Sequence, residues 1–197
     1  PQGRRLSCKD PSLPQIPIIE HADVRRMLLF QRAVTEGALS LILQCCMYSD
    51  LSRTDDADQN QKYSFLLDLL TPVAKTYPSE NGIMAVSQAL QILGGYGYCQ
   101  EFPVEQYFRD IRIHPIHEGT TGIQALDLLG RKVVMKNGQA LRLFFQEVEA
   151  AIQDATQFEE LKPYAERLKD GLNKLQSVTL HRVQFGIKGD VELFLAD

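Results

Sequence analysis

The residues best suited to chemistry lie in one short segment, residues 114–122, which reads His-Pro-Ile-His-Glu-Gly-Thr-Thr-Gly. Pro115 interrupts regular helix there, and a new helical pattern begins at about Thr121. A carboxylate on such a loop, beside the free amides of a helix start, can act as a general base or border an anion site. Glu118 can equally be a structural helix-start carboxylate that the helix dipole favours. The residue types and their spacing leave both interpretations open.

Two histidines close to Glu118 raise the question of a metal site. His114, His117 and Glu118 offer nitrogen and oxygen ligands within a short stretch. Their order is His-x-x-His-Glu, whereas the zinc protease signature places two histidines four residues apart on a regular helix, which Pro115 prevents. We therefore expect no metal here.

A second unusual segment, residues 94–98, reads Gly-Gly-Tyr-Gly-Tyr and follows a helical pattern. A dinucleotide-binding glycine motif must follow a strand and open a helix, so this segment does not predict a Rossmann site. A helix that ends in glycines can still offer backbone amides to a phosphate group. A simple left-handed helix cap is the alternative interpretation.

The elements that would position these segments are helices. Apolar residues at helical spacing, among them Met27, Val34 and Tyr48, share one face and predict a long amphipathic helix from Asp23 to about Tyr48. An acidic stretch, residues 49–61, then predicts a solvated loop. Helical pattern resumes over residues 63–77, where Pro72 must either kink the helix or begin a new one, and Pro78-Ser79 predicts another boundary before a helix up to Gly94.

Further helices are expected over residues 104–110, 121–135, 139–155 and 159–183, with a break at Asn137-Gly138. No run of alternating β-branched residues competes with them, so we predict an all-α fold, an antiparallel helical bundle. Three parts are expected: a proline-rich extended arm over residues 1–22, the bundle over 23–136, and an incomplete helical extension over 137–197.

Composition excludes several classes of function. The chain of 197 residues is 44% hydrophobic and carries 21 basic and 25 acidic residues, a formal net charge of −4, so it has no excess basic field for nucleic acid. We find no apolar run of membrane-spanning length and no signal-peptide stretch at the N-terminus. The four cysteines form no disulfide or metal pattern. We expect a cytoplasmic protein with reduced thiols, and no nucleic-acid or membrane partner.

Several motifs, taken in order, resemble the C-terminal helical domain of flavin-dependent acyl-CoA dehydrogenases. They are Gln-Ile-Leu-Gly-Gly-Tyr-Gly-Tyr at 91–98, Pro-Val-Glu-Gln at 103–106, Arg-Asp at 109–110 and Ile-His-Glu-Gly-Thr at 116–120. Residues 17–28 and 124–128 resemble the longer subgroup of that family, whose members carry an extra helical extension. The ordered series is more specific than any motif within it.

The resemblance implies a reaction and a set of site residues. An acyl-CoA would be oxidised to the 2,3-enoyl-CoA with FAD as cofactor, Glu118 would be the catalytic base, and Gly119 would lie beside the substrate. FAD contacts would come from Thr120, Thr121 and Gly122, while a neighbouring subunit's FAD would meet Gln91, Ile92, Leu93, Gly94 and Gly95. The whole enzyme would be a homo-oligomer, a dimer or tetramer, with an electron-transfer flavoprotein as its electron acceptor.

The sequence departs from the family pattern at two positions. His117 stands where a tyrosine is common, and Gly122 where a glutamine is frequent. The family's N-terminal and middle domains have no counterpart here, so the resemblance implies a C-terminal third that is inactive alone. An acyl-CoA oxidase, or a helical oligomerisation or interaction module without catalysis, remains as an alternative.

Overall fold

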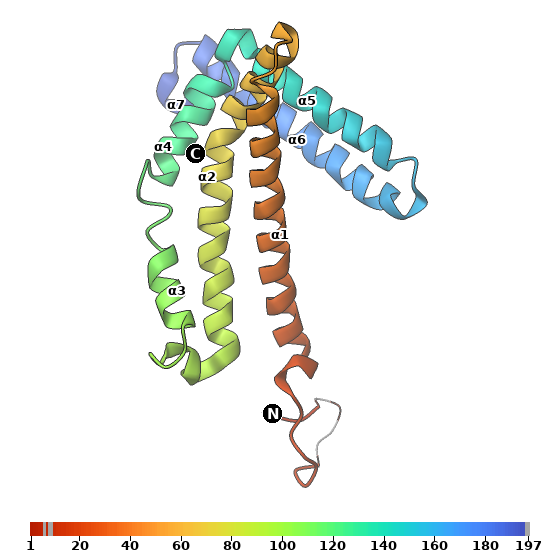
Figure 1. Ribbon diagram of the computed structural model, residues 1–197, viewed down its shortest axis with the longest axis vertical. Helices are drawn as coiled ribbons and strands as arrows, with labels where there is room; N and C mark the ends of the chain where they lie inside the picture. Colours follow the sequence, from red (N-terminus) through yellow and green to blue (C-terminus); the bar gives the residue numbers. More distant parts are fainter. Residues whose placement is uncertain (6, 8–9, 196–197) are drawn as a thin grey trace. The chain divides into compact units, whose positions relative to one another are not determined.

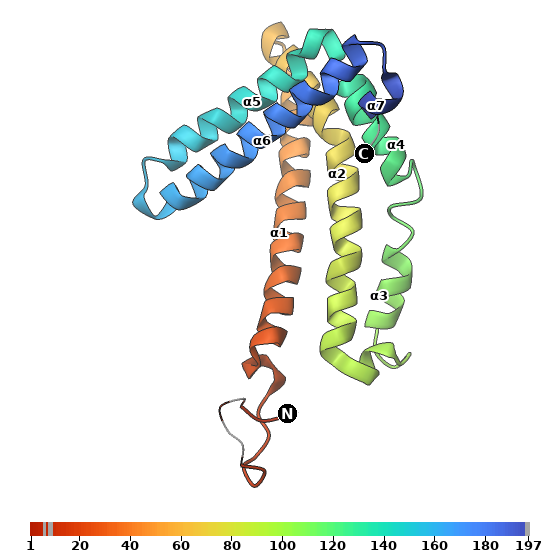
Figure 2. The same ribbon diagram turned by 180° about the vertical axis from the view of Figure 1, so that it is seen from behind.

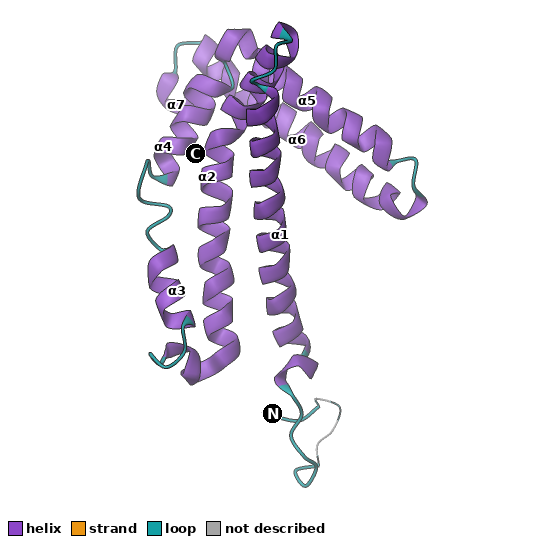
Figure 3. Cartoon of the chain, in the orientation of Figure 1, coloured by secondary structure: helices purple, strands orange, loops and turns teal. Residues whose placement is uncertain are grey.

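The computed structural model of the chain describes residues 1–5, 7 and 10–195, and these contain helices, turns and loops but no strand (Figure 3). The predicted all-α fold is therefore confirmed. Figures 1 and 2 show the helices from two sides. Their bounds are α1 Ala22–Leu51, α2 Ala57–Leu93, α3 Val104–Ile111, α4 Thr121–Asp127, α5 Met135–Ala155, α6 Lys162–Ile187 and α7 Val191–Leu195.

The chain forms two compact units, and the long helices α1 and α2 contribute to both. The first unit comprises Pro1–Leu43 and Ala74–Thr121, and the second comprises Gln44–Val73 and Gly122–Asp197. Each unit thus combines segments that are distant in sequence. The three parts expected from the sequence remain a prediction. Among the described residues, no helix is both long and apolar enough to cross a membrane.

In the first unit, α1 and the second half of α2 pack side by side. A Cβ added to Gly37 of α1 would lie 3.1 Å from the Tyr77 hydroxyl oxygen of α2, so the small residue permits this close approach. Met27 and Val34 are buried, as the helical spacing predicts. Figures 1 and 2 both show α3 alongside the last part of α2, and α3 leads into the loop that carries Glu118.

The connection between α1 and α2 is shorter than predicted. The prediction of a solvated loop over residues 49–61 is wrong, because α1 continues to Leu51 and α2 already begins at Ala57. Asp56 explains the early start: its Oδ1 accepts hydrogen bonds from the backbone N–H groups of Asp58 at 3.0 Å and Gln59 at 3.1 Å. The acidic stretch therefore caps a helix instead of forming a long loop.

The two prolines predicted to interrupt α2 do not end it. The helix runs without a break from Ala57 to Leu93, through both Pro72 and Pro78. Pro72 is almost fully buried, so packing compensates for its missing N–H group. The boundary predicted at Pro78-Ser79 is wrong, because the Ser79 hydroxyl does not cap a helix and donates to the Lys75 carbonyl oxygen at 2.5 Å.

The predicted end of α2 at the glycines is confirmed. Gly94 has a positive φ of 59°, and a 3₁₀ turn over Gly94–Tyr98 follows the helix. A left-handed residue terminates a helix, and glycine adopts this conformation without a Cβ clash.

The second unit is built around α5 and α6, which Figures 1 and 2 show as an antiparallel pair. One cluster of buried side chains is formed by Ile152, Ala165 and Leu172, and another by Leu69, Val133 and Ala140. The helix predicted over residues 121–135 is interrupted, since a π-helical turn over Leu128–Lys132 follows α4. Positive φ angles at Lys136, Asn137 and Gly138 confirm the predicted break at Asn137-Gly138.

Candidate active site

The segment between α3 and α4 is a closed loop within the first unit. Its N–H groups at Ile116 and His117 donate to the Ile113 carbonyl oxygen at 2.9 and 3.1 Å. The N–H of Thr121 donates to the Pro115 carbonyl oxygen at 3.2 Å, which joins the two ends of the loop. Pro115 is buried, whereas Glu118 is exposed. The loop thus presents Glu118 on a short, internally bonded turn.

Glu118 has a left-handed backbone conformation. Its φ is 53°, and the φ of the following Gly119 is 92°. Glycine adopts such angles freely, but a residue with a Cβ pays about 1–2 kcal/mol. The strain at Glu118 must be offset by contacts that fix the turn, and a strained non-glycine residue in a pocket is a recurrent feature of functional sites.

Two side chains of α2 contact the loop just after Glu118. The Lys75 ammonium donates to the Gly119 carbonyl oxygen at 2.6 Å. The Thr121 hydroxyl donates to a carboxylate oxygen of Glu80. These bonds join residues 44 and 41 positions apart in the sequence. The backbone around Glu118 is therefore fastened to α2 immediately after the carboxylate-bearing residue.

Glu118 borders a cavity of about 370 Å³ between α2 and the loop. The His114 and His117 rings line it with their centroids 5.6 Å apart, and the His117 Nδ1 lies 3.1 Å from the Ile113 carbonyl oxygen. Ala74, Lys75, Pro78, Ser79 and Ile111 complete the lining. Within the ranges that the structure describes, no three His, Cys, Asp or Glu side chains lie close enough to hold a metal ion.

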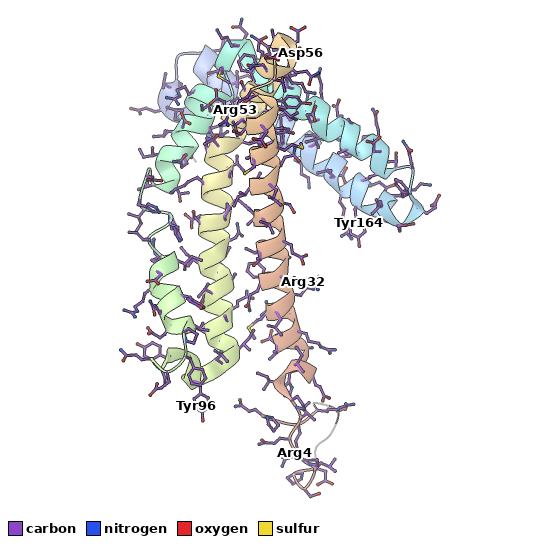
Figure 4. All side chains as sticks on the ribbon, in the orientation of Figure 1. Arg4, Arg32, Arg53, Asp56, Tyr96 and Tyr164 are labelled. Carbon is purple, nitrogen blue, oxygen red and sulfur yellow. The ribbon has the colours of Figure 1, made fainter. Side chains whose placement is uncertain are left out.

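The residues predicted to contact flavin divide between two places. Thr120, Thr121 and Gly122 directly follow Glu118 and Gly119 at the start of α4. Leu93 lies eighteen residues beyond Lys75 along α2, which at 1.5 Å per residue is about 27 Å from the Glu118 loop. The structure therefore does not bring Gln91–Gly95 and Glu118 together within one chain. Figure 4 shows the neighbouring Tyr96 at that far end of α2.

The glycines in both places are open to an approaching ligand. A Cβ added to Gly94, Gly95 or Gly122 would have no neighbour within 4 Å. Gln91 is exposed, and Tyr96 and Tyr98 beyond it are 70% and 86% exposed. The far end of α2 thus offers uncovered backbone with aromatic side chains beside it.

Sequence reasoning missed Lys75 and Glu80. Both residues lie five positions apart on a helix rich in polar side chains, and neither belongs to an unusual motif. A charged residue on an amphipathic helix ordinarily faces solvent. No local signal distinguishes these two, and only the packing of α2 against the loop assigns them to the site.

Comparisons with known proteins identify the family of the chain. A family model described as "Acyl-CoA dehydrogenase, C-terminal domain" matches residues 8–134. The chain belongs to the acyl-CoA dehydrogenase family. Among curated relatives, it is 42% identical over 135 residues to 3-methylmercaptopropionyl-CoA dehydrogenase of Ruegeria pomeroyi, covering 68% of this chain and 23% of that protein.

Two other members of the acyl-CoA dehydrogenase family match more of the chain. It is 34% identical over 183 residues to the broad-specificity linear acyl-CoA dehydrogenase FadE5 of Mycobacterium tuberculosis, covering 90% of this chain and 30% of that protein. The crystal structure of Caenorhabditis elegans ACDH-11 in complex with C11-CoA matches with a TM-score of 0.74 at 26% identity. That match covers 86% of this chain and 28% of ACDH-11. The chain therefore spans less than a third of the length of these relatives.

Proposed function

We propose that the chain is the C-terminal helical part of an FAD-dependent acyl-CoA dehydrogenase and that Glu118 is its catalytic base. The observation that carries the proposal is the position of Glu118, on a strained turn that borders a cavity, in a chain that belongs to this family. The substrate would be an acyl-CoA, and the product the 2,3-enoyl-CoA. The match to a relative solved with C11-CoA supports a CoA thioester as the substrate class.

The reaction needs one base close to the thioester. The proton on the α-carbon goes to the Glu118 carboxylate, the β-hydrogen leaves with its electron pair, and a double bond forms between the two carbons. FAD, when bound, supplies the acceptor for that hydride. A single carboxylate, held in place and able to take and release a proton, is what the chain itself must contribute.

The residues around Glu118 suit this role. Gly119 has no side chain to obstruct an acyl group that approaches the carboxylate. Thr120, Thr121 and Gly122, at the start of α4, would contact FAD in the same subunit. Gln91, Ile92, Leu93, Gly94 and Gly95 would contact the FAD of a neighbouring subunit, which requires a homo-oligomer. Support for this division comes from the distance of about 27 Å along α2 and from the open glycines.

An acyl-CoA oxidase shares the first half-reaction and is the second candidate. It reoxidises its flavin with oxygen, whereas a dehydrogenase passes its electrons to an electron-transfer flavoprotein. Oxygen consumption in the absence of that protein would separate the two. A helical interaction module without catalysis would reduce no flavin.

The decisive experiment replaces Glu118 with glutamine in the full-length protein. Glu118→Gln keeps the size of the side chain but cannot accept the proton, so anaerobic reduction of the flavin by acyl-CoA should slow by about a hundredfold or more. FAD content and acyl-CoA binding should stay near normal. Glu166→Gln, at an exposed position of α6, makes the same change elsewhere and should have no effect. Reduction at the wild-type rate in Glu118→Gln would refute the assignment.

A further inference from the structure

Lys75 and Glu80 have a relation to Glu118 that no motif indicates. They project from α2 and bond to the loop at Gly119 and Thr121, the first and third residues after Glu118. One bond holds a backbone carbonyl and the other holds a side chain at the start of α4. Together the two bonds fix the position of the segment between the turn and α4 against α2.

The turn needs such support because it contains two successive left-handed residues. Without such support Glu118 would return to a negative φ, because most backbone conformations open to a residue with a Cβ have one. Such a return redirects the chain after Glu118, including the Gly119–Thr120 peptide, whose carbonyl oxygen accepts a hydrogen bond from Lys75 at 2.6 Å. The Lys75 bond is therefore available when Glu118 is left-handed and is lost when the Gly119 carbonyl group moves away.

Lys75 is well suited to this task. Its side chain is partly buried and lines the same cavity as Glu118, so water competes less for its ammonium group than at an exposed site. A charged donor makes a stronger bond to a carbonyl oxygen than a neutral donor does. Glu80, five residues after Lys75 on α2, is also partly buried, and its carboxylate accepts a hydrogen bond from the Thr121 hydroxyl.

We propose that Lys75 and Glu80 are positioning residues: by bonding Gly119 and Thr121 they hold the turn at Glu118 and Gly119 in its left-handed conformation and so aim the carboxylate into the cavity. This inference rests on the proposed function, because the orientation of the carboxylate matters to the reaction only if Glu118 is the catalytic base. In this inference neither residue exchanges a proton with the substrate. Lys75 acts on the reaction through the backbone of the loop, and Glu80 acts through the Thr121 side chain.

The first test measures catalysis in the full-length protein. Lys75→Met preserves the length of the side chain and removes its donor. It should lower the rate of flavin reduction by about ten- to a hundredfold, the cost of a misplaced catalytic group, with little change in KM or FAD content. Lys75→Arg keeps a charged donor and should recover most of the rate. Lys169→Met, at an exposed position of α6, is the matched control and should behave as wild type.

The second test reads the loop itself and does not depend on activity. Hydrogen exchange of a peptide covering residues 113–121 should be about tenfold faster or more in Lys75→Met, because the loop opens more often without its tie to α2. Glu80→Met should accelerate exchange in the same peptide, which provides a second variant if Lys75→Met does not fold. Peptides of α6 should exchange as in wild type.

The outcomes distinguish this inference from the proposed function. If the wild-type protein reduces no flavin but the loop exchanges faster in Lys75→Met, the proposed activity fails and the positioning contact stands. If reduction slows in Lys75→Met while exchange of the loop is unchanged, or if Lys75→Arg recovers nothing, the positioning role is overturned. Unchanged reduction and exchange in both Lys75→Met and Glu80→Met would overturn it as well.

Discussion

Gly97 is a position in the turn after α2 where a single added methyl group should be costly. This glycine is buried, and a Cβ built on it would lie 2.8 Å from the Leu90 carbonyl oxygen, 3.1 Å from the Leu90 Cα and 3.0 Å from the Leu93 Cβ. Two of these atoms belong to the helix backbone and cannot rotate away. Ordinary contact begins at about 3.4 Å, so Gly97→Ala forces the turn to move by roughly 0.6 Å.

The size of the effect follows from two opposing contributions. Overpacking of a tight site costs about 1–3 kcal/mol. Replacing glycine by alanine also restricts the unfolded chain, which returns about 0.4–1 kcal/mol. We therefore expect Gly97→Ala to lower the free energy of unfolding by about 1–2 kcal/mol. For a chain of this size that corresponds to a decrease in Tm of about 2–8 °C, measurable by circular dichroism.

Gly95→Ala is the matched control, because it makes the same chemical change two residues earlier. A Cβ at Gly95 has no neighbour within 4 Å and no positive φ to oppose it. Its Tm should stay unchanged or rise slightly. Equal losses of stability in both variants, or no loss in Gly97→Ala, would refute the argument from the close backbone contact.

Three further predictions follow from other sites. Burial, and to a smaller extent the neighbouring Cys46, raises the pKa of the Cys45 thiol above its ordinary value of 9.0. Iodoacetamide at pH 8 should therefore modify the exposed Cys46 several-fold faster than Cys45. This difference should narrow at higher pH as Cys45 ionises; equal rates by mass spectrometry at pH 8 would contradict it. His117→Tyr removes a titratable ring beside Glu118 and should alter the pH dependence of flavin reduction while substantial turnover remains; complete loss would mean that His117 takes part in proton abstraction. The 197-residue chain alone should retain little FAD through purification, since most of a flavin-binding cavity would be contributed by other domains; stoichiometric retention would disprove this.

Local sequence was sufficient for the helical class of the fold and for several of its landmarks. The spacing of Met27, Val34 and Tyr48 correctly identified the buried face of α1, because side chains three, four or seven positions apart share one face of any helix. Gly94 correctly marked the end of α2, and Asn137-Gly138 correctly marked a break in the helical backbone. Both predictions succeeded because these residues tolerate a positive φ. The loop bearing Glu118 was also evident, since Pro115 prevents a regular helix there.

The tertiary structure decided the features that depend on distant partners. Pro72 lies inside a continuous helix because burial compensates for its missing hydrogen bond, and no local pattern reports that burial. The division of α1 and α2 between two compact units likewise follows from packing. Lys75 and Glu80 acquire their partners across more than forty residues, and the same side chains on an isolated helix would face water. Such contacts depend on where separate elements meet in space, which the spacing of residues along one element does not specify.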